Sequence, residues 1–221
     1  MPGQDDMPQG RLTRAFFARP VLQVAPELLG CTVSHSGVTV RLTEVEAYDG
    51  SNDPGSHAFR GQTPRTRVMF GEPGGLYVYF TYGMHWCANL VCGSAGAASA
   101  VLLRAGEVVG GLEVARTRRA GVVDRDLARG PARLAMTLAL TRDQNGIDTT
   151  ATDSPLVLRA PLPGSLSGAT VRTGPRVGVS GSGGDVMAYP WRFWLEGEAT
   201  VSAYRPGKVR PPKPAAGSGD P

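Results

Sequence analysis

The stretch Leu42-Thr43-Glu44-Val45-Glu46-Ala47-Tyr48 decides how the middle of this chain folds. Its pattern is that of a β-strand, in which successive side chains point to opposite faces of the sheet. Glu44, Glu46 and Tyr48 therefore share one face of the predicted strand. His57 follows eleven residues after Glu46. A carboxylate beside aromatic rings can hold a flat ring and deliver a water to it, which makes a nucleobase a candidate substrate.

Further strand and helix patterns lie on both sides of this stretch. Strands are predicted at residues 32–35, 38–48, 75–81, 85–92, 100–104, 156–159, 171–180 and 192–203. Helices are predicted over 16–29, within 106–119, and from Pro131 to Leu140, with Pro131 at the first helical position. Strands and helices that do not alternate regularly indicate an α+β fold. We expect one mixed domain with a largely antiparallel, curved β-sheet core and flanking helices.

The length and charge of the chain limit the classes of protein that it can form. A chain of 221 residues can bury a substantial core without disulfides or metals. We expect a disordered leader over 1–10, one domain over 11–205 and a disordered tail over 206–221. The net charge is +4 and the only lysines are Lys208 and Lys213. The abundant arginines suit phosphate binding, and a GC-rich genome would enrich arginine equally.

The three cysteines, Cys31, Cys87 and Cys92, lie in mostly apolar surroundings. Their odd number and spacing match neither a disulfide framework nor a common zinc site, so we expect buried free thiols. The polar, acidic first ten residues do not form a signal peptide, and no apolar run reaches the roughly 20 residues that span a bilayer. The sequence therefore predicts a soluble, intracellular protein.

Aromatic residues are concentrated over residues 76–82. Tyr77 and Tyr79 alternate with apolar residues along a predicted strand, and Tyr82-Gly83 suggests a hairpin turn before the next strand. Tyr82 at the tip of this hairpin could enter a base stack as a wedge. The alternative is that these tyrosines form cross-strand packing pairs.

Several polar residues lie in otherwise apolar strands. Glu46 could act as a general base or pair with an arginine, and Glu44 suits the second, supporting role better. Asn89 and Arg104 must find partners if they are buried, either on a neighbouring strand or on a ligand. The Gly181-Ser182-Gly183-Gly184 segment lacks the lysine of a Walker phosphate loop and is predicted to be a flexible loop.

The order and spacing of many short motifs resemble one family, the alkyladenine DNA glycosylases, also called 3-methyladenine DNA glycosylases of the methylpurine type. The resemblance runs from about Leu12 to Tyr204. It rests on Glu46-Ala47-Tyr48, His57, Gln62-Thr63-Pro64-Arg65, Met69-Phe70, Leu76-Tyr77-Val78-Tyr79 with Tyr82-Gly83-Met84, Asn89, Leu102-Leu103-Arg104-Ala105, Gly130-Pro131 and Arg176-Val177-Gly178-Val179.

The resemblance implies a role for each of these site residues. Glu46 matches the general base that activates the attacking water. Arg104 and the carbonyl of Val177 match groups that hold this water. The residues that match the pocket around the flipped base are Tyr48, His57 and Tyr79. Tyr82 matches the residue of a protruding, DNA-intercalating hairpin that fills the gap in the duplex, and Asn89 matches a steric filter against the 2-amino group of guanine.

The resemblance also implies an activity and a partner. We expect a base-excision repair enzyme that flips alkylated or deaminated purines out of double-stranded DNA and leaves an abasic site. It would be a bacterial, cytoplasmic monomer that meets the nucleoid through DNA, without metal, cofactor or protein partner. No lysine lies near the proposed site, so we expect no strand cleavage. The 181–190 segment lacks the Trp and basic residues of the vertebrate pattern, which suggests either a weaker grip on the duplex or an altered range of substrates.

Two other functions were weighed against this one. A zinc-dependent nucleobase deaminase needs His-x-Glu with Pro-Cys-x-x-Cys, and the sequence has neither motif. A binding module that recognises lesions without catalysis would not need both Glu46 and Arg104. The sequence therefore favours a glycosylase.

Overall fold

Strand β2 (Val38–Asp49) runs through the middle of an eight-stranded sheet. The protein is described by a computed structural model that covers residues 10–81 and 83–207. The main path of the sheet is β3-β4-β5-β2-β1-β6, while β8 pairs with β2 and β7 with β8. All pairs of these strands are antiparallel. The other strands are β1 (Thr32–His35), β3 (Leu76–Thr81), β4 (His85–Cys92), β5 (Ser99–Gly110), β6 (Val157–Arg159), β7 (Val171–Gly174) and β8 (Arg192–Leu195).

In the described part of the chain, four α-helices accompany the sheet: α1 (Arg14–Phe17), α2 (Val21–Glu27), α3 (Leu112–Arg118) and α4 (Pro131–Thr137). α2 packs on β2 and β5, and α4 packs on β4 and β5. Both helices bury apolar residues, such as Val24 and Leu134, in one core with the sheet. None of the helices in the described part of the chain is long and apolar enough to cross a membrane. The predicted α+β domain with an antiparallel sheet is confirmed.

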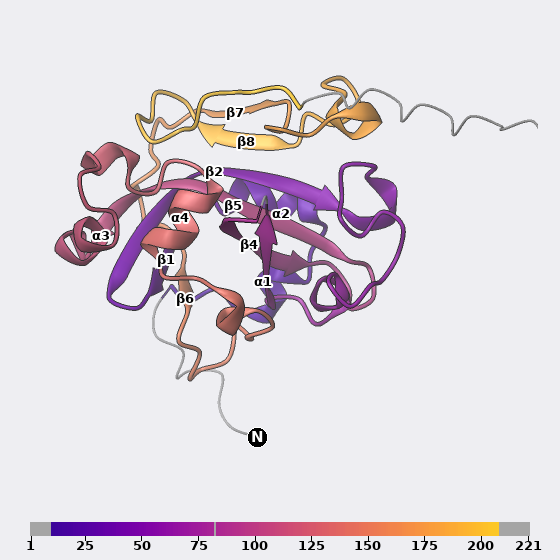
Figure 1. Ribbon diagram of the computed structural model, residues 1–221, viewed down its shortest axis with the longest axis horizontal. Helices are drawn as coiled ribbons and strands as arrows, with labels where there is room; N and C mark the ends of the chain where they lie inside the picture. Colours follow the sequence, from indigo (N-terminus) through magenta and orange to yellow (C-terminus); the bar gives the residue numbers. More distant parts are fainter. Residues whose placement is uncertain (1–9, 82, 208–221) are drawn as a thin grey trace, which may run out of the picture.

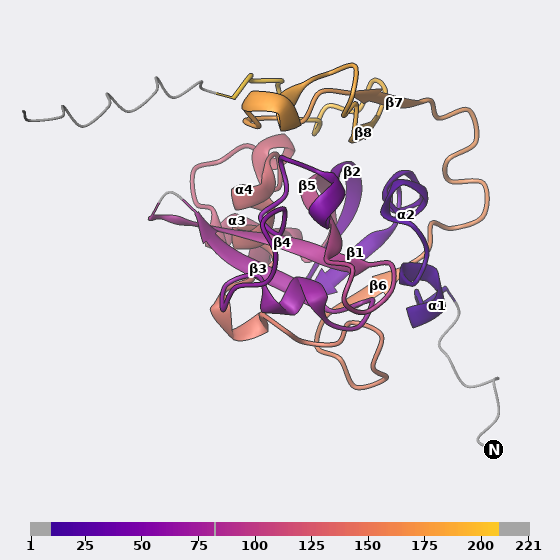
Figure 2. The ribbon, with the colours of Figure 1, turned by 90° about the vertical axis from the view of Figure 1, so that its right-hand side faces the viewer.

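The strands β3 and β4 form a hairpin that projects from the body of the domain (Figure 2). Phe80 and Met84, near its tip, expose 46% and 67% of their surface. Tyr82 lies outside the described residues, so its predicted role stays a prediction. The predicted leader and tail fall almost entirely on residues outside the described part as well.

Four predicted elements were too long and one was too short. The helix from Pro131 to Leu140 ends at Thr137. The helix over 16–29 is two helices, because Pro20 lies between them as the N-cap of α2. The strand over 171–180 ends at Gly174, before Pro175, which has no backbone N–H for a sheet. The strand over 192–203 ends at Leu195, where the chain turns. β5 continues past Arg104 to Gly110, because β2 pairs with it over its whole length.

The pairing of β2 with β5 is irregular where the charged residues lie. Glu44 pairs with Ala105 and Val45 with Leu103, so Arg104 has no register partner on β2. Such a β-bulge changes the direction of a side chain and is common beside active sites. Here it lets the guanidinium of Arg104 reach the carboxylates on β2. β8 pairs with Glu44, Val45 and Glu46 along the other edge of β2 and completes the surroundings of these residues (Figure 1).

Candidate active site

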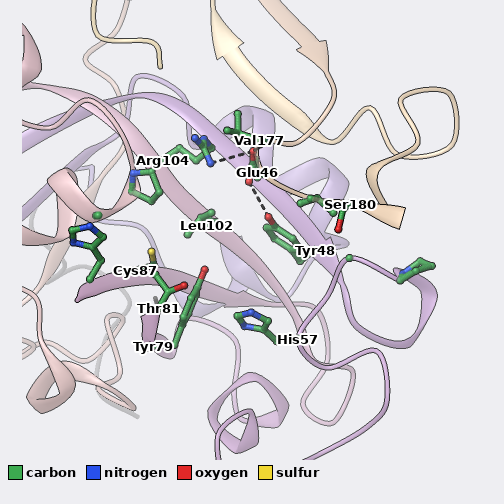
Figure 3. A pocket seen from close by; sticks show the side chains of 17 residues that line it. Glu46, Tyr48, His57, Tyr79, Thr81, Cys87, Leu102, Arg104, Val177 and Ser180 are labelled. Atoms are coloured by element: carbon green, nitrogen blue, oxygen red, sulfur yellow. Dashed lines mark hydrogen bonds and ion pairs between the residues drawn. The ribbon is translucent and has the colours of Figure 1, made fainter. Parts of the chain in front are cut away.

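A hollow of about 410 Å³ opens beside the middle of β2. Glu46 and Tyr48 contribute from β2, and the start of α4 and the 177–180 segment close two of its sides. Its volume lies within the range of small-molecule sites. In Figure 3, Tyr48, His57 and Tyr79 line one end, while Arg104 and Val177 lie beside Glu46 at the other. The remaining residues that line it are Pro54, Gly55, Thr81, His85, Cys87, Leu102, Pro131, Ala132, Gly178, Val179 and Ser180.

The carboxylate of Glu46 is fully buried and is surrounded by donors. The backbone N–H of Val177 donates to Oε1 at 2.6 Å, and Nη1 of Arg104 lies 3.3 Å from the same oxygen. The hydroxyl of Tyr48 donates to Oε2 at 2.9 Å. Burial raises the pKa of the Tyr48 phenol well above its ordinary value, and the charge of Glu46 adds to this effect. Tyr48 therefore keeps its proton and remains a donor to Glu46.

Arg104 is held between two carboxylates. Its Nε donates to Oε1 of Glu44 at 2.8 Å, and Glu44 also accepts from Nε of Arg192 at 2.7 Å. Burial lowers the pKa of the Arg104 guanidinium, but the charges of Glu46 and Glu44 outweigh it and the net shift is upward. Arg104 therefore carries a permanent positive charge beside Glu46.

A cation lies over the ring of Tyr48. The guanidinium of Arg176 lies 4.5 Å from the centre of the Tyr48 ring. Arg176 is itself buried, and it donates to both carboxylate oxygens of Asp53 and to the backbone carbonyls of Ala47 and Gly183. This single side chain connects β2, the loop after β2 and the loop after β7. It thereby fixes the position of the Tyr48 ring and of the adjoining Val177.

The aromatic end of the hollow is built on β3. The ring of Tyr79 stacks on Tyr77 with centroids 5.5 Å apart and meets the edge of His57 at 4.6 Å. Burial of the His57 ring, with a smaller effect from the charge of Arg65, lowers its pKa to about 4. His57 is therefore neutral at physiological pH. A neutral ring can stack on a cationic base without repelling it.

A smaller hollow of about 40 Å³ shares the aromatic residues Tyr48, His57 and Tyr79 and reaches Asn89. Asn89 is buried on β4, and its side-chain amide donates to the carbonyl of Tyr77 at 3.1 Å. That bond fixes the orientation of the amide. A space of this size holds about one water molecule, so a ring that enters from the larger hollow meets a close limit at Asn89.

The segment 177–180 forms one wall of the larger hollow, and the chain continues from it to Gly184. This continuation, Gly181–Gly184, is a 3₁₀ turn packed on the loop after β2, rather than the loosely held loop that the glycines suggested. A Cβ at Gly183 would clash with the backbone of Gly55, and a Cβ at Gly55 would clash with Arg176. The two walls can approach this closely only because both positions are glycine.

The structure brings together six of the predicted site residues around the larger hollow: Glu46, Tyr48, His57, Tyr79, Arg104 and Val177. Asn89 lines the smaller hollow beside them. Glu44 has the supporting, arginine-paired position that was predicted for it. Sequence reasoning assigned no role to Asp53, Arg176, Arg192 or Ser202. Arg176 stood in a quoted motif, but nothing in its neighbours indicated that it is buried.

The described residues contain no group of three His, Cys, Asp or Glu side chains that could hold a metal ion. Cys31, Cys87 and Cys92 are buried free thiols, as predicted. Burial raises the pKa of each of these thiols. Cys87 lines the hollow, and as a protonated thiol it is a weak nucleophile.

Comparison with known proteins agrees with this geometry. The family model described as methylpurine-DNA glycosylase matches residues 15–199. The chain belongs to the methylpurine-DNA glycosylase family. The matched range includes Glu46, which carries the buried carboxylate, and Arg104 and Val177, which contact it. As a methylpurine-DNA glycosylase the chain is a hydrolase of N-glycosidic bonds, and the enzyme class predicted from its sequence is confirmed.

Relatives of this methylpurine-DNA glycosylase occur in several bacteria. A protein of Streptomyces avermitilis is 56% identical over 88% of this chain and 92% of its own length. One of Frankia casuarinae is 54% identical over 86% of this chain and 92% of its own length. One of Leifsonia xyli is 52% identical over 87% and 92%. Each is named "Putative 3-methyladenine DNA glycosylase".

Proposed function

We propose that this glycosylase flips an alkylated or deaminated purine out of double-stranded DNA, hydrolyses its N-glycosidic bond with a water activated by Glu46, and leaves an abasic site. The observation that supports this most directly is a fully buried carboxylate at the side of an aromatic-lined hollow. A general base must lie within reach of the water that it activates and of the carbon that the water attacks. A nucleotide whose ring lies between Tyr48 and His57 brings its sugar towards Glu46.

The surroundings of Glu46 suit a base that works on a water. The N–H of Val177 and the hydroxyl of Tyr48 hold the carboxylate in one orientation. In the proposed complex, Arg104 and the carbonyl of Val177 orient the water, and Glu46 takes its proton as the oxygen attacks C1′. The N–H of Val177 is already engaged by Glu46, which leaves the carbonyl of that residue for the water.

The aromatic end supplies the binding energy for base flipping. Extrusion of a nucleotide costs a few kcal/mol, least for damaged or badly paired bases, and stacking on an aromatic ring returns about 1–3 kcal/mol per base. Purines methylated at N3 or N7 carry a positive charge, which the π-faces of the tyrosines attract. A neutral His57 adds a stacking surface without an opposing charge.

Two further roles belong to this proposal. Asn89 excludes a guanine 2-amino group, because the hollow beside it has no room for a further substituent. Tyr82, which stands between β3 and β4 in the sequence, fills the gap left in the duplex. The exposed side chains of Phe80 and Met84 on the same hairpin provide apolar surface for this insertion.

We further propose that the enzyme acts on its own as a monomer and cleaves no DNA strand. Strand cleavage by a glycosylase begins with an amine that forms a Schiff base. The only lysines of the chain, Lys208 and Lys213, fall outside the described residues, and among the residues that the structure describes no lysine lines the hollow. Borohydride reduction of a reacting complex tests this proposal. A trapped covalent complex with DNA would overturn it.

The decisive experiment measures base release from four duplexes that contain 3-methyladenine, 7-methylguanine, hypoxanthine or 1,N6-ethenoadenine. The wild-type enzyme is expected to release at least one of these bases. Glu46→Gln is expected to abolish release and to retain binding of the same duplex, because the amide keeps the shape of the carboxylate but cannot take the proton. Full activity of this variant would exclude Glu46 as the base. Binding without release by the wild-type enzyme would favour a lesion-binding module instead.

A further inference from the structure

Glu44 is a buried carboxylate that does not line the hollow of the active site. It lies two residues before Glu46 on β2, and no part of its side chain is exposed. Burial of a charge is costly unless partners compensate it. The structure gives Glu44 an unusually complete set of partners, and all of them connect it to the surroundings of Glu46.

Four hydrogen bonds end on the Glu44 carboxylate. Arg104 and Arg192 donate to Oε1 from their Nε atoms at 2.8 and 2.7 Å. The hydroxyl of Ser202 is 2.9 Å from Oε1, and its backbone N–H donates to Oε2 at 2.7 Å. Arg192 in turn donates to the carbonyl of Ser202 and stacks on the Trp194 ring at 4.8 Å. The carboxylate is therefore fixed from β5, from β8 and from the segment after β8.

This set of bonds determines how Arg104 faces Glu46. Glu44 accepts the hydrogen bond from Nε of Arg104. The Ser202 hydroxyl accepts a second one from Nη2 of Arg104 at 3.1 Å. The remaining nitrogen, Nη1, is the one that lies 3.3 Å from Oε1 of Glu46. A planar guanidinium that is held at two nitrogens has its third nitrogen fixed as well. Glu44 thus acts on Glu46 through Arg104.

We propose that Glu44 is a positioning residue for base release: with Arg192 and Ser202 it orients Arg104 and shares the charge of Arg104 with Glu46. This inference rests on the proposed function of Glu46 as the base. Two carboxylates and two guanidinium groups balance one another in the buried cluster. With Glu44 present, Arg104 does not bind Glu46 so strongly that the base loses its ability to accept a proton.

Removal of the Glu44 charge has a defined consequence for the pH dependence of the reaction. Without a neighbouring like charge, and with Arg104 free to pair with Glu46 alone, the ionised form of the base is favoured. The other groups around Glu46 are unchanged by this removal. They are Tyr48 on β2, Tyr79 on β3, Cys87 on β4 and Arg176 after β7.

The test compares Glu44→Gln with wild type in single-turnover base release across pH, on the lesion of the four-duplex panel that wild type releases fastest. We expect the plateau rate to fall by roughly 10- to 100-fold, since the base is weaker and Arg104 is less well fixed. The acidic midpoint of the rate should move about one pH unit lower. Affinity for the same duplex should change by less than about threefold, because Glu44 does not touch the hollow.

Glu107→Gln is the matched control. Glu107 lies on β5 and pairs with Arg41 of β2 at 2.8 Å, so the variant loses one ion pair between the same two strands. Half of the Glu107 side chain is exposed, and it has no contact with Arg104. This control is expected to keep both the rate and the midpoint of wild type. Glu44→Asp, which keeps the charge, is expected to restore the midpoint.

A folded Glu44→Gln protein whose acidic midpoint equals that of wild type would overturn the proposal. If this variant does not fold, Ser202→Ala decides, because it removes one hydroxyl between Glu44 and Arg104 and keeps every charge. A fall of several-fold in its single-turnover rate supports the proposal, and an unchanged rate overturns it. Failure of the proposed function would be seen separately, as full activity of Glu46→Gln or as no base release by wild type.

Discussion

The backbone N–H of Val177 donates a hydrogen bond to Oε1 of Glu46 at 2.6 Å, although 131 residues separate the two along the chain. The bond joins the segment after β7 to the middle of β2. A carboxylate held by a backbone donor cannot turn without moving that segment. The orientation of Glu46 is therefore a property of the folded chain, as well as of its own strand.

Replacement of the Val177 peptide N–H by an ester oxygen, through the corresponding hydroxy acid, is expected to lower the rate of base release about tenfold. Hydrogen bonds to charged groups contribute about 1.5–3 kcal/mol, and in the proposed mechanism this bond holds the carboxylate in its reactive orientation. Single-turnover kinetics on a lesion duplex measure the effect. Val177→Ala keeps the N–H and should retain nearly the full rate of base release. If both proteins lost the same fraction of this rate, the Val177 side chain rather than its N–H would be responsible.

Tyr48→Phe separates the two tasks of this residue. The variant keeps the ring that is proposed to stack on the base and loses the hydroxyl that donates to Oε2 of Glu46. We expect the rate to fall by about tenfold with little change in the dissociation constant of the lesion duplex. Tyr48→Ala should weaken both, because stacking is lost as well. Single-turnover kinetics measure the rate, and a fluorescence titration measures the dissociation constant. Equal changes of both quantities in the two variants would contradict this separation of tasks.

Asp53→Asn is expected to lower the free energy of unfolding by about 3 kcal/mol, because it leaves the buried guanidinium of Arg176 without a counter-charge. Urea denaturation measures this change. Glu196→Gln is the control, since Glu196 pairs with Arg172 in an exposed ion pair. Its cost should stay below about 1 kcal/mol. Similar costs for both variants would show that Arg176 finds other compensation.

His57 should make the protein less stable in mild acid. Its pKa is lowered to about 4 in the folded chain from an ordinary value of 6.5, so the unfolded chain binds the proton first as pH falls. The contribution of His57 to the free energy of unfolding is fully present above pH 6.5 and is lost as the pH falls from 6.5 towards 4. Since the side chain is partly exposed, we expect a loss of only about 1 kcal/mol at pH 5.

Urea denaturation of wild type and His57→Gln at pH 7 and pH 5 measures this contribution. When the pH is raised from 5 to 7, wild type should gain this amount of unfolding free energy from His57, and His57→Gln should not. The unfolding free energy of wild type minus that of the variant should therefore increase by that amount. His35 and His85 are present in both proteins and cancel. A difference that does not vary with pH would contradict the prediction.

Much of the fold could be predicted because its signals are local. The alternation around Glu46, and the hairpin before and after Tyr82-Gly83, gave β2, β3 and β4 nearly their observed bounds. The late strands were harder. β7 and β8 are four residues each, and what ends them is the turn chemistry after Gly174 and Leu195 rather than a change in hydrophobic pattern.

The site residues also fall into those with a local sequence signal and those without one. Glu46, Tyr48 and Tyr79 could be predicted because strand alternation sets their faces, and Asn89 because a polar residue in an apolar strand needs an explanation. Arg192 and Asp53 could not, since their roles depend on contacts with residues more than 100 positions away. The bulge at Arg104 also depends on pairing between strands, and no local sequence pattern predicts it.

The close approach of Gly55 and Gly183 sets the distance between the loop after β2 and the segment after β7. A methyl group at either position would act as a spacer between the loop after β2 and the segment that carries Val177. Gly183→Ala would therefore widen the slot for the base and pull a donor away from Glu46 without changing any residue that lines the hollow. In the proposed mechanism, one position outside the hollow would therefore affect both the space for the base and the hold on Glu46.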